Sequence, residues 1–154
     1  MRPRPWLPLL ALLLAAPLGC AGRTHADHAA PGAAKFEMQR YFVVLLRRGP
    51  HWAPASEAGV SELFAAHMAH LQAMTAAGHL VLVGPFELPE GAPEGAPAGL
   101  CVYRVASEER ARDLASADPA VAAGRFTVEV RPWYGPAGID YPGREDFAAN
   151  GPGL

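Results

Sequence analysis

The order of the apolar segments limits the folds that this chain can adopt. Residues 41–48 (YFVVLLRR) are rich in β-branched and aromatic side chains and end at a Gly-Pro pair, which predicts a strand. Apolar residues then recur at spacings of three and four over residues 60–74, which predicts an amphipathic helix that ends at Gly78. Residues 79–86 and 99–105 predict two more strands. The first elements therefore run strand, helix, strand, strand.

A second helix and a fourth strand follow. Ser107 can cap a helix whose first turn holds two glutamates. Asp118 followed by Pro119 repeats this start signal for a short helical turn that ends at Gly124. Residues 126–131 alternate apolar and polar side chains, as a half-buried strand does. The order β-α-β-β-α-β predicts an α+β, ferredoxin-like fold, with a four-stranded antiparallel sheet and both helices on one of its faces.

The predicted sheet is apolar on both faces. Residues 41–46 and 80–83 place apolar side chains on both sides of their strands, whereas two helices can cover only one side. The other side would expose a larger apolar patch than soluble monomers usually carry. We therefore expect a symmetric homodimer packed sheet to sheet, as in a dimeric α/β barrel.

The N-terminus predicts export. In residues 1–20, two arginines precede an uncharged apolar stretch over residues 7–19, which is shorter than the about 20 residues that span a bilayer. Cys20 follows a small residue, as in the lipobox of bacterial lipoproteins, but Pro17 stands where that pattern prefers Leu. Lipidation of Cys20 and plain signal cleavage both remain open. We expect a periplasmic protein or a membrane-anchored lipoprotein of a bacterial envelope, with membrane contact only through the signal or the lipid.

The remaining chain divides into three parts by composition. Residues 21–39 predict a flexible tether, residues 40–134 the folded domain, and residues 135–154 a Pro/Gly-rich tail. Loss of two arginines with the signal turns 13 basic residues into 11, against 15 acidic ones. This acidic balance excludes nucleic acid as an expected partner. Without Cys20, Cys101 has no cysteine to pair with, so a packed core must supply the stability.

His67 is the most informative polar residue, because it lies within the apolar stripe of the first predicted helix. It is either a neutral core histidine or a general base in a pocket. A carboxylate partner would be Asp118, which the predicted fold can bring toward that helix. Capping of a helix would alone explain an aspartate before proline, so Asp118 also has two interpretations.

Several segments together resemble the YCII-related (YciI-like) domain proteins. They are residues 41–52 (YFVVLLRRGPHW), 67–71 (HMAHL), 78–86 (GHLVLVGPF) and 107–133 (SEERARDLASADPAVAAGRFTVEVRPW), with YGPAGI after them. The resemblance implies a ferredoxin-like subunit of a dimeric α/β barrel with a His-Asp pair in its pocket. By position this pair is His67 and Asp118, which favours the general base. Relatives of the family include enzymes that eliminate groups or move protons on lactone- or muconate-type compounds.

Other residues could contact a small-molecule ligand. Arg47 or Arg48 could hold an anionic substrate, although an exposed arginine is often only a solvated charge. Trp52 and Trp133 could line a pocket, or serve as core or dimer contacts. His70 lies one helical turn after His67 and could join the site. We expect no metal there, because no third ligand is evident, and no cofactor, because no cofactor motif is present.

Two functions remain open. One is a small lyase or isomerase in which His67 removes a proton and Asp118 orients its ring, acting on a lactone- or oxo-acid-like substrate. No Gly-x-Ser-x-Gly nucleophile motif is present, and Cys101 in a strand suits packing better than catalysis. The alternative is a non-catalytic ligand-binding or accessory module of the envelope.

Overall fold

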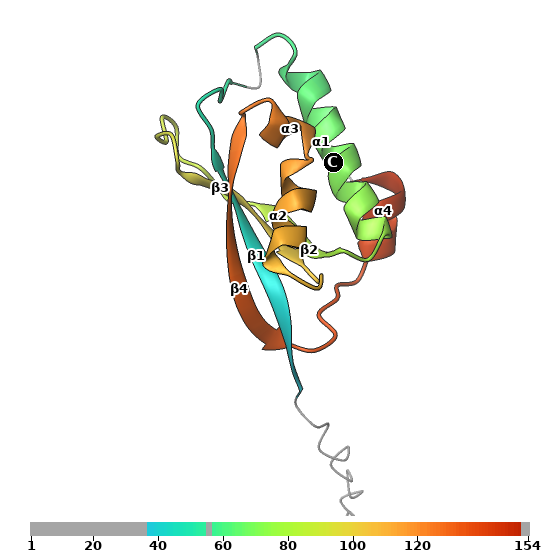
Figure 1. The fold of residues 1–154 in the computed structure, drawn as a ribbon. Helices are drawn as coiled ribbons and strands as arrows, with labels where there is room; N and C mark the ends of the chain where they lie inside the picture. Colours follow the sequence, from blue (N-terminus) through green and yellow to red (C-terminus); the bar gives the residue numbers. More distant parts are fainter. Residues whose placement is uncertain (1–36, 55–56, 152–154) are drawn as a thin grey trace, which may run out of the picture. The chain divides into compact units, whose positions relative to one another are not determined.

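The structure, a computed structural model, describes residues 37–54 and 57–151. The predicted signal with Cys20 and the tether up to residue 36 lie outside the described residues. A single antiparallel sheet has the strand order β2-β3-β1-β4. The elements are β1 (Met38–Arg48), α1 (Val60–Ala76), β2 (Leu80–Pro85), β3 (Pro97–Tyr103), α2 (Glu108–Ser116), α3 (Pro119–Ala122), β4 (Phe126–Pro136) and α4 (Arg144–Asn150). This confirms the predicted α+β, ferredoxin-like subunit, with the helices beside one face of the sheet (Figure 1).

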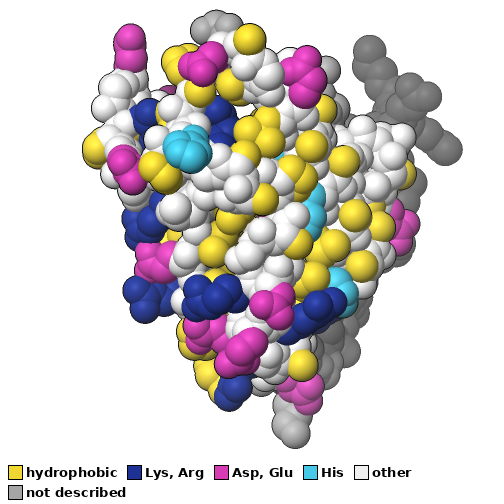
Figure 2. Space-filling model, turned by 45° about the horizontal axis from the view of Figure 1, so that its top comes forward, with side chains coloured by type: hydrophobic (Ala, Val, Ile, Leu, Met, Phe, Trp, Pro, Cys, Tyr) yellow, Lys and Arg dark blue, Asp and Glu magenta, His cyan; other side chains and the backbone are white. Residues whose placement is uncertain are grey.

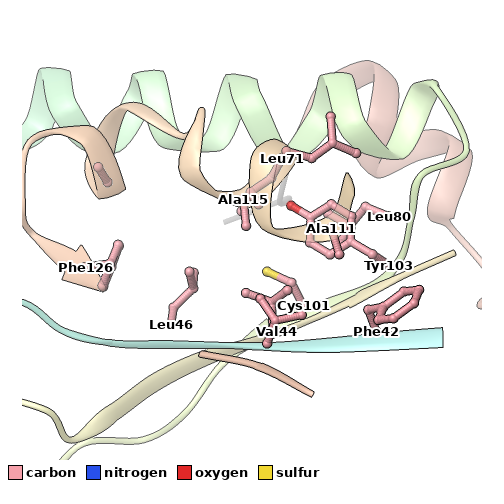
Figure 3. Packing of buried hydrophobic residues seen from close by; sticks show 13 residues of the cluster. Phe42, Val44, Leu46, Leu71, Leu80, Cys101, Tyr103, Ala111, Ala115 and Phe126 are labelled. Atoms are coloured by element: carbon pink, nitrogen blue, oxygen red, sulfur yellow. The ribbon is translucent and has the colours of Figure 1, made fainter. Parts of the chain in front are cut away.

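The main core lies between that face and the helices, and it follows from the alternation along β1. Phe42, Val44 and Leu46 all point toward the helices and are buried. Leu71 of α1 and Ala111 of α2 pack above them (Figure 3). The small alanine side chains of α2 let this helix lie close to the sheet. This continuous apolar contact between the sheet and the helices fixes the positions of α1 and α2.

The opposite face of the sheet carries a smaller apolar cluster. Tyr41, Val81 and Val102 are buried there, with exposed fractions of 0%, 1% and 3%. The segment after β4 contributes to this cover, because the hydroxyl of Tyr41 donates to the Pro136 carbonyl and accepts the backbone N–H of Ile139. Part of the apolar surface for which we expected a second chain is therefore already covered within one chain.

The folded domain is longer at both ends of the sequence than the composition predicts. Met38 and Gln39, assigned to the tether, pair with Pro136 and Gly135 as the first rungs of the β1·β4 ladder. The predicted tail contains α4, whose Phe147 carbonyl accepts a hydrogen bond from the Gln72 side chain of α1. Strand pairing satisfies the backbone groups of the first segment, and packing on α1 buries part of the second. The local composition of these segments does not indicate either partner.

Within the part of the chain that the structure describes, no helix is both long and apolar enough to cross a bilayer.

Candidate functional site

Two short-range signals position the central pair of the site. His67 lies on the buried stripe of α1 together with Val60, Leu71 and Thr75. Asp118 precedes α3, and its Oδ1 accepts the backbone N–H of Ala120 at 2.8 Å, which is an N-cap bond. Because α3 lies beside α1 (Figure 1), the cap carboxylate of one helix faces the buried side of the other.

The structure brings His67 and Asp118 into direct contact. Nδ1 of His67 lies 2.6 Å from Oδ2 of Asp118, and the two residues are only 6% and 2% exposed. The carboxylate can only accept, so the imidazole Nδ1–H donates this hydrogen bond. Asp118 thus acts both as the cap of α3 and as the partner of His67, one oxygen for each. In the neutral imidazole this arrangement leaves the lone pair on Nε2.

Aromatic rings surround the imidazole of His67. Its ring centre lies 5.4 Å from that of Phe126 and 6.0 Å from that of Phe64. In the described chain, the buried side-chain nitrogens without a hydrogen-bond partner are Arg48 Nε and His70 Nε2. Nε2 of His67 makes no hydrogen bond with another described residue. A basic Nε2 beside a fixed Nδ1–H is the geometry of a general base.

Two cavities of the structure border α4, one lined by residues between Asp140 and Asp146 and the other by Ala76 and α4. Neither is lined by His67 or Asp118.

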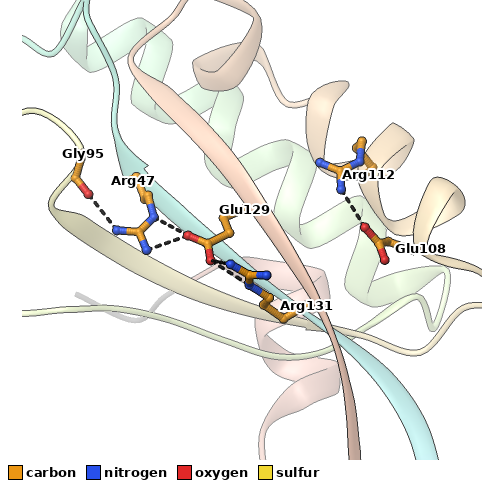
Figure 4. A network of polar contacts seen from close by, with 6 residues as sticks. All are labelled: Arg47, Gly95, Glu108, Arg112, Glu129 and Arg131. Atoms are coloured by element: carbon orange, nitrogen blue, oxygen red, sulfur yellow. Dashed lines mark hydrogen bonds and ion pairs between the residues drawn. The ribbon is translucent and has the colours of Figure 1, made fainter.

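Arg47 and Trp133 lie on the other face of the sheet. The guanidinium of Arg47 contacts Glu129, with Nε 2.7 Å from Oε2, and donates to the Gly95 carbonyl at 2.9 Å (Figure 4). The ring of Trp133 packs on Tyr41, with 5.8 Å between ring centres. The structure does not bring these two predicted substrate contacts to His67, and their partners give them structural roles.

Trp52 and His70 lie closer to the pair. The ring of Trp52 packs against Phe126 at 5.6 Å between centres, and Phe126 in turn packs on His67. His70 is half-buried one turn further along α1. Among residues 37–54 and 57–151, no group of three or more His, Cys, Asp or Glu side chains is placed to hold a metal ion.

Arg48 and Arg125 are the residues at this end of the fold that sequence reasoning missed or left undecided. Both guanidinium groups lie over the ring of Trp52, at 4.7 and 4.2 Å from its centre. Alternation along β1 separates Arg48 from Arg47, because Arg48 shares the helix-facing side with Leu46. That signal was present in the sequence, whereas nothing local indicated Arg125.

The charge of Asp118 also affects the pKa values of two neighbouring buried groups, Cys101 and Tyr103. Burial, and to a smaller extent the charge of Asp118, raises the pKa of the Cys101 thiol to about 12. Burial likewise raises the pKa of the Tyr103 hydroxyl, with the charges of Cys101 and Asp118 adding to the effect. Both groups therefore stay neutral near neutral pH, which leaves Cys101 unsuited to nucleophilic catalysis.

Comparison with known proteins identifies the family of this chain. The family model described as the YCII-related domain matches residues 42–134. Comparison with curated protein sequences gives no significant match. A solved structure with a similar chain is 5-chloro-2-hydroxyhydroquinone dehydrochlorinase from Burkholderia phenoliruptrix AC1100 in complex with 2,5-dihydroxybenzoquinone, at 21% identity and a TM-score of 0.44. The similarity covers 60% of this chain and 92% of that one.

Proposed function

The chain belongs to the YCII-related domain family, and from this premise we propose that it is a small-molecule lyase or isomerase with His67 as general base. Asp118 is the positioning residue for the imidazole. The observation that carries the proposal is the 2.6 Å bond between Nδ1 of His67 and Oδ2 of Asp118 in a nearly buried setting. Such a bond selects the tautomer with a basic Nε2.

The proposed reaction is proton removal from carbon. Nε2 of His67 takes the proton next to a carbonyl group of a lactone- or oxo-acid-like substrate, and the electron pair of the C–H bond moves into an enolate. In an isomerase, the imidazolium returns the proton to another carbon; in a lyase, the electron pair expels a leaving group from the adjacent carbon. The charge of Asp118 stabilises the imidazolium between the two steps. A positioned base of this kind contributes about 10²- to 10⁴-fold in rate.

The double role of Asp118 supports the proposal. Its Oδ1 is fixed by the Ala120 N–H at 2.8 Å, so the carboxylate cannot turn away from the imidazole without losing the cap. An imidazole whose orientation is already fixed loses little conformational entropy when it reaches the transition state, which lowers the barrier.

Proton exchange with solvent tests this chemistry before a full reaction is identified. We would incubate the purified chain in D₂O with a panel of small lactones and oxo-acids and follow deuterium incorporation by NMR. Wild type should incorporate deuterium next to the carbonyl of at least one compound. His67→Gln should abolish this incorporation, whereas His79→Gln, a change at another half-buried histidine, should retain it. Unchanged incorporation in a folded His67→Gln variant would rule out the proposed role.

A second function is a non-catalytic ligand-binding or accessory module of the envelope. The observation that favours it is the low exposure of His67, which is 6%. This function requires that a bound compound leaves unchanged. The same NMR panel separates the two, because deuterium incorporation or a product signal from a bound compound contradicts the module.

Export is part of the proposal and rests on the sequence of residues 1–20. Intact mass spectrometry of the membrane fraction tests it. A lipidated Cys20 adds the mass of its acyl chains, and plain cleavage yields a lighter, unmodified terminus in the soluble fraction. A chain that keeps its first twenty residues after expression in a bacterial host would contradict export.

We also propose a homodimer through the outer face of the sheet. Leu82 and Trp133 remain 40% and 41% exposed there, next to the half-buried Val43 and Leu100. Light scattering at micromolar concentration should give twice the mass of one chain. A monomer mass would refute the dimer.

A further inference from the structure

The loop after β1 and the start of β4 form a corner that holds two arginines together. Gly49 N–H donates to the Arg125 carbonyl at 2.8 Å, and His51 N–H donates to the Gly124 carbonyl at 3.0 Å. These bonds place Arg48, the last residue of β1, beside Arg125, which directly precedes β4. Figure 2 shows basic, acidic, histidine and hydrophobic side chains at the end of the molecule that it brings forward.

Both guanidinium groups share one aromatic neighbour. The Cζ atom of Arg48 lies 4.7 Å from the centre of the Trp52 ring, and that of Arg125 lies 4.2 Å from it. The cation–π contact with Trp52 stabilises the position of each guanidinium separately. It does not remove the repulsion between the two charges, and the pKa of Arg125 is lowered first by burial and next by the charge of Arg48. The corner therefore carries an excess of positive charge.

In the described chain, neither of these two charges is paired with a carboxylate. Neither Arg48 nor Arg125 takes part in an ion pair, and Glu57 acts on Arg125 only from a distance. Arg125 is 8% exposed, and among the described residues only its Nη1 is bound, to the Ala53 carbonyl at 2.7 Å. Nε of Arg48 is buried without any partner. Buried donors of this kind are normally satisfied, so the corner is short of an acceptor.

This corner adjoins the His67–Asp118 pair through a single ring. Phe126 lies 5.4 Å from the imidazole of His67, 5.6 Å from the ring of Trp52 and 5.9 Å from the Arg125 guanidinium. Phe126 is itself 9% exposed, so one buried core ring links the arginines to the imidazole of His67.

We propose that Arg48 and Arg125, supported on Trp52, bind the oxyanion group of an anionic, unsaturated small molecule. The inference rests on the proposed function, for which it supplies the substrate class. A carboxylate and a phosphate share the required chemistry, because both accept the paired N–H groups of a guanidinium. The rest of the molecule extends from the arginines toward His67, where its acidic carbon meets Nε2.

Three ring compounds test the site in the purified full-length chain. Benzoate and phenyl phosphate carry the two candidate anions on the same ring, and benzyl alcohol is the uncharged control. Calorimetry gives the affinity, and NMR follows the indole N–H of Trp52, assigned with Trp52→Phe. At least one anion should bind and shift this signal, with benzyl alcohol at least about tenfold weaker. The stronger of the two anions identifies the group that the site prefers.

Variants connect the binding to the two arginines. Arg48→Met removes the half-buried charge, and Arg125→Lys keeps the charge but removes the guanidinium fork. Each should weaken anion binding by about tenfold or more. Arg112→Met, an equivalent change at an exposed arginine of α2 paired with Glu108 (Figure 4), should leave the affinity unchanged. If Arg125→Lys fails to fold, Arg48→Met alone decides the result.

The inference is overturned if neither anion shifts the Trp52 signal at millimolar concentration, if benzyl alcohol binds as well as both anions, or if folded arginine variants keep wild-type affinity. His67→Gln separates this inference from the proposed function. Anion binding that survives in His67→Gln, in a chain that exchanges no substrate proton, leaves the anion site standing and refutes only the catalysis. Deuterium exchange that depends on His67, together with anion binding that neither arginine variant weakens, would support the catalysis and refute the anion site.

Discussion

The backbone of Gly49 packs directly against the carbonyl group of Gly124, so closely that a Cβ atom at position 49 would lie 2.2 Å from the carbonyl oxygen. No side chain fits at that distance. This contact joins the end of β1 to the start of β4, and it holds Arg48 and Arg125 at one corner.

Gly49→Ala should therefore destabilise the fold and separate the two strand ends. We expect a loss of roughly 1–3 kcal/mol in the free energy of unfolding, because the Gly124 carbonyl is rigid backbone that has to move. Gly84→Ala is the matched control, since a Cβ there meets nothing within 4 Å. Urea unfolding of the three proteins checks this, and equal stability of both variants would contradict the close contact.

Asp118→Ala should be strongly destabilising. It removes the cap bond to Ala120 and leaves the Nδ1–H of His67 without an acceptor in a buried position. The two losses together correspond to roughly 2–4 kcal/mol. Urea unfolding measures the change, and a loss within about 0.5 kcal/mol would show that the buried contact adds little.

Asp118→Asn should separate stability from the state of the imidazole. The asparagine oxygen can keep the cap bond, so the free energy of unfolding should stay within about 1 kcal/mol of wild type. The amide nitrogen then faces Nδ1 of His67 as a donor, which moves the ring proton to Nε2 and removes the basic lone pair. The ¹⁵N shifts of the His67 ring report the tautomer, and an unchanged tautomer would contradict the role assigned to Asp118.

Cys101 should resist alkylation in the folded protein. Burial, with the charge of Asp118 as a smaller contribution, raises its pKa to about 12, so almost no thiolate exists at mildly alkaline pH. Iodoacetamide treatment followed by peptide mass spectrometry should find Cys101 unmodified in buffer and modified in concentrated urea. Equal modification under both conditions would show that the thiol is accessible.

Glu129 should make stability depend on acid pH. Its pKa lies below the ordinary value of 4.5, because Arg131 and Arg47 hydrogen-bond to the carboxylate. A lowered folded pKa means that this stabilisation is present above pH 4.5 and is lost as the pH falls through the folded pKa. Glu129→Gln should be less stable than wild type near neutral pH, and the difference should shrink on acidification. A difference that is independent of pH would contradict this assignment.

Local pattern was sufficient for most elements of the fold. The apolar spacing in α1 and the cap signals before α2 and α3 act within a few residues, so the sequence alone indicates them. The same spacing placed His67 on the buried side of α1. The extra length of β1 and β4, and the helix α4, depend on partners distant in sequence and were missed for that reason.

The candidate site shows the same division. Sequence by itself determined that His67 faces the core and that Asp118 begins a helix, because both follow from local periodicity and capping. Only the tertiary structure decided that one carboxylate serves both the cap and the imidazole, since this requires α3 to lie beside α1. It also decided that Arg125 joins Arg48, because backbone pairing across more than seventy residues brings them together. The sequence gives the chemical type of each side chain, whereas long-range packing decides which other side chains it contacts.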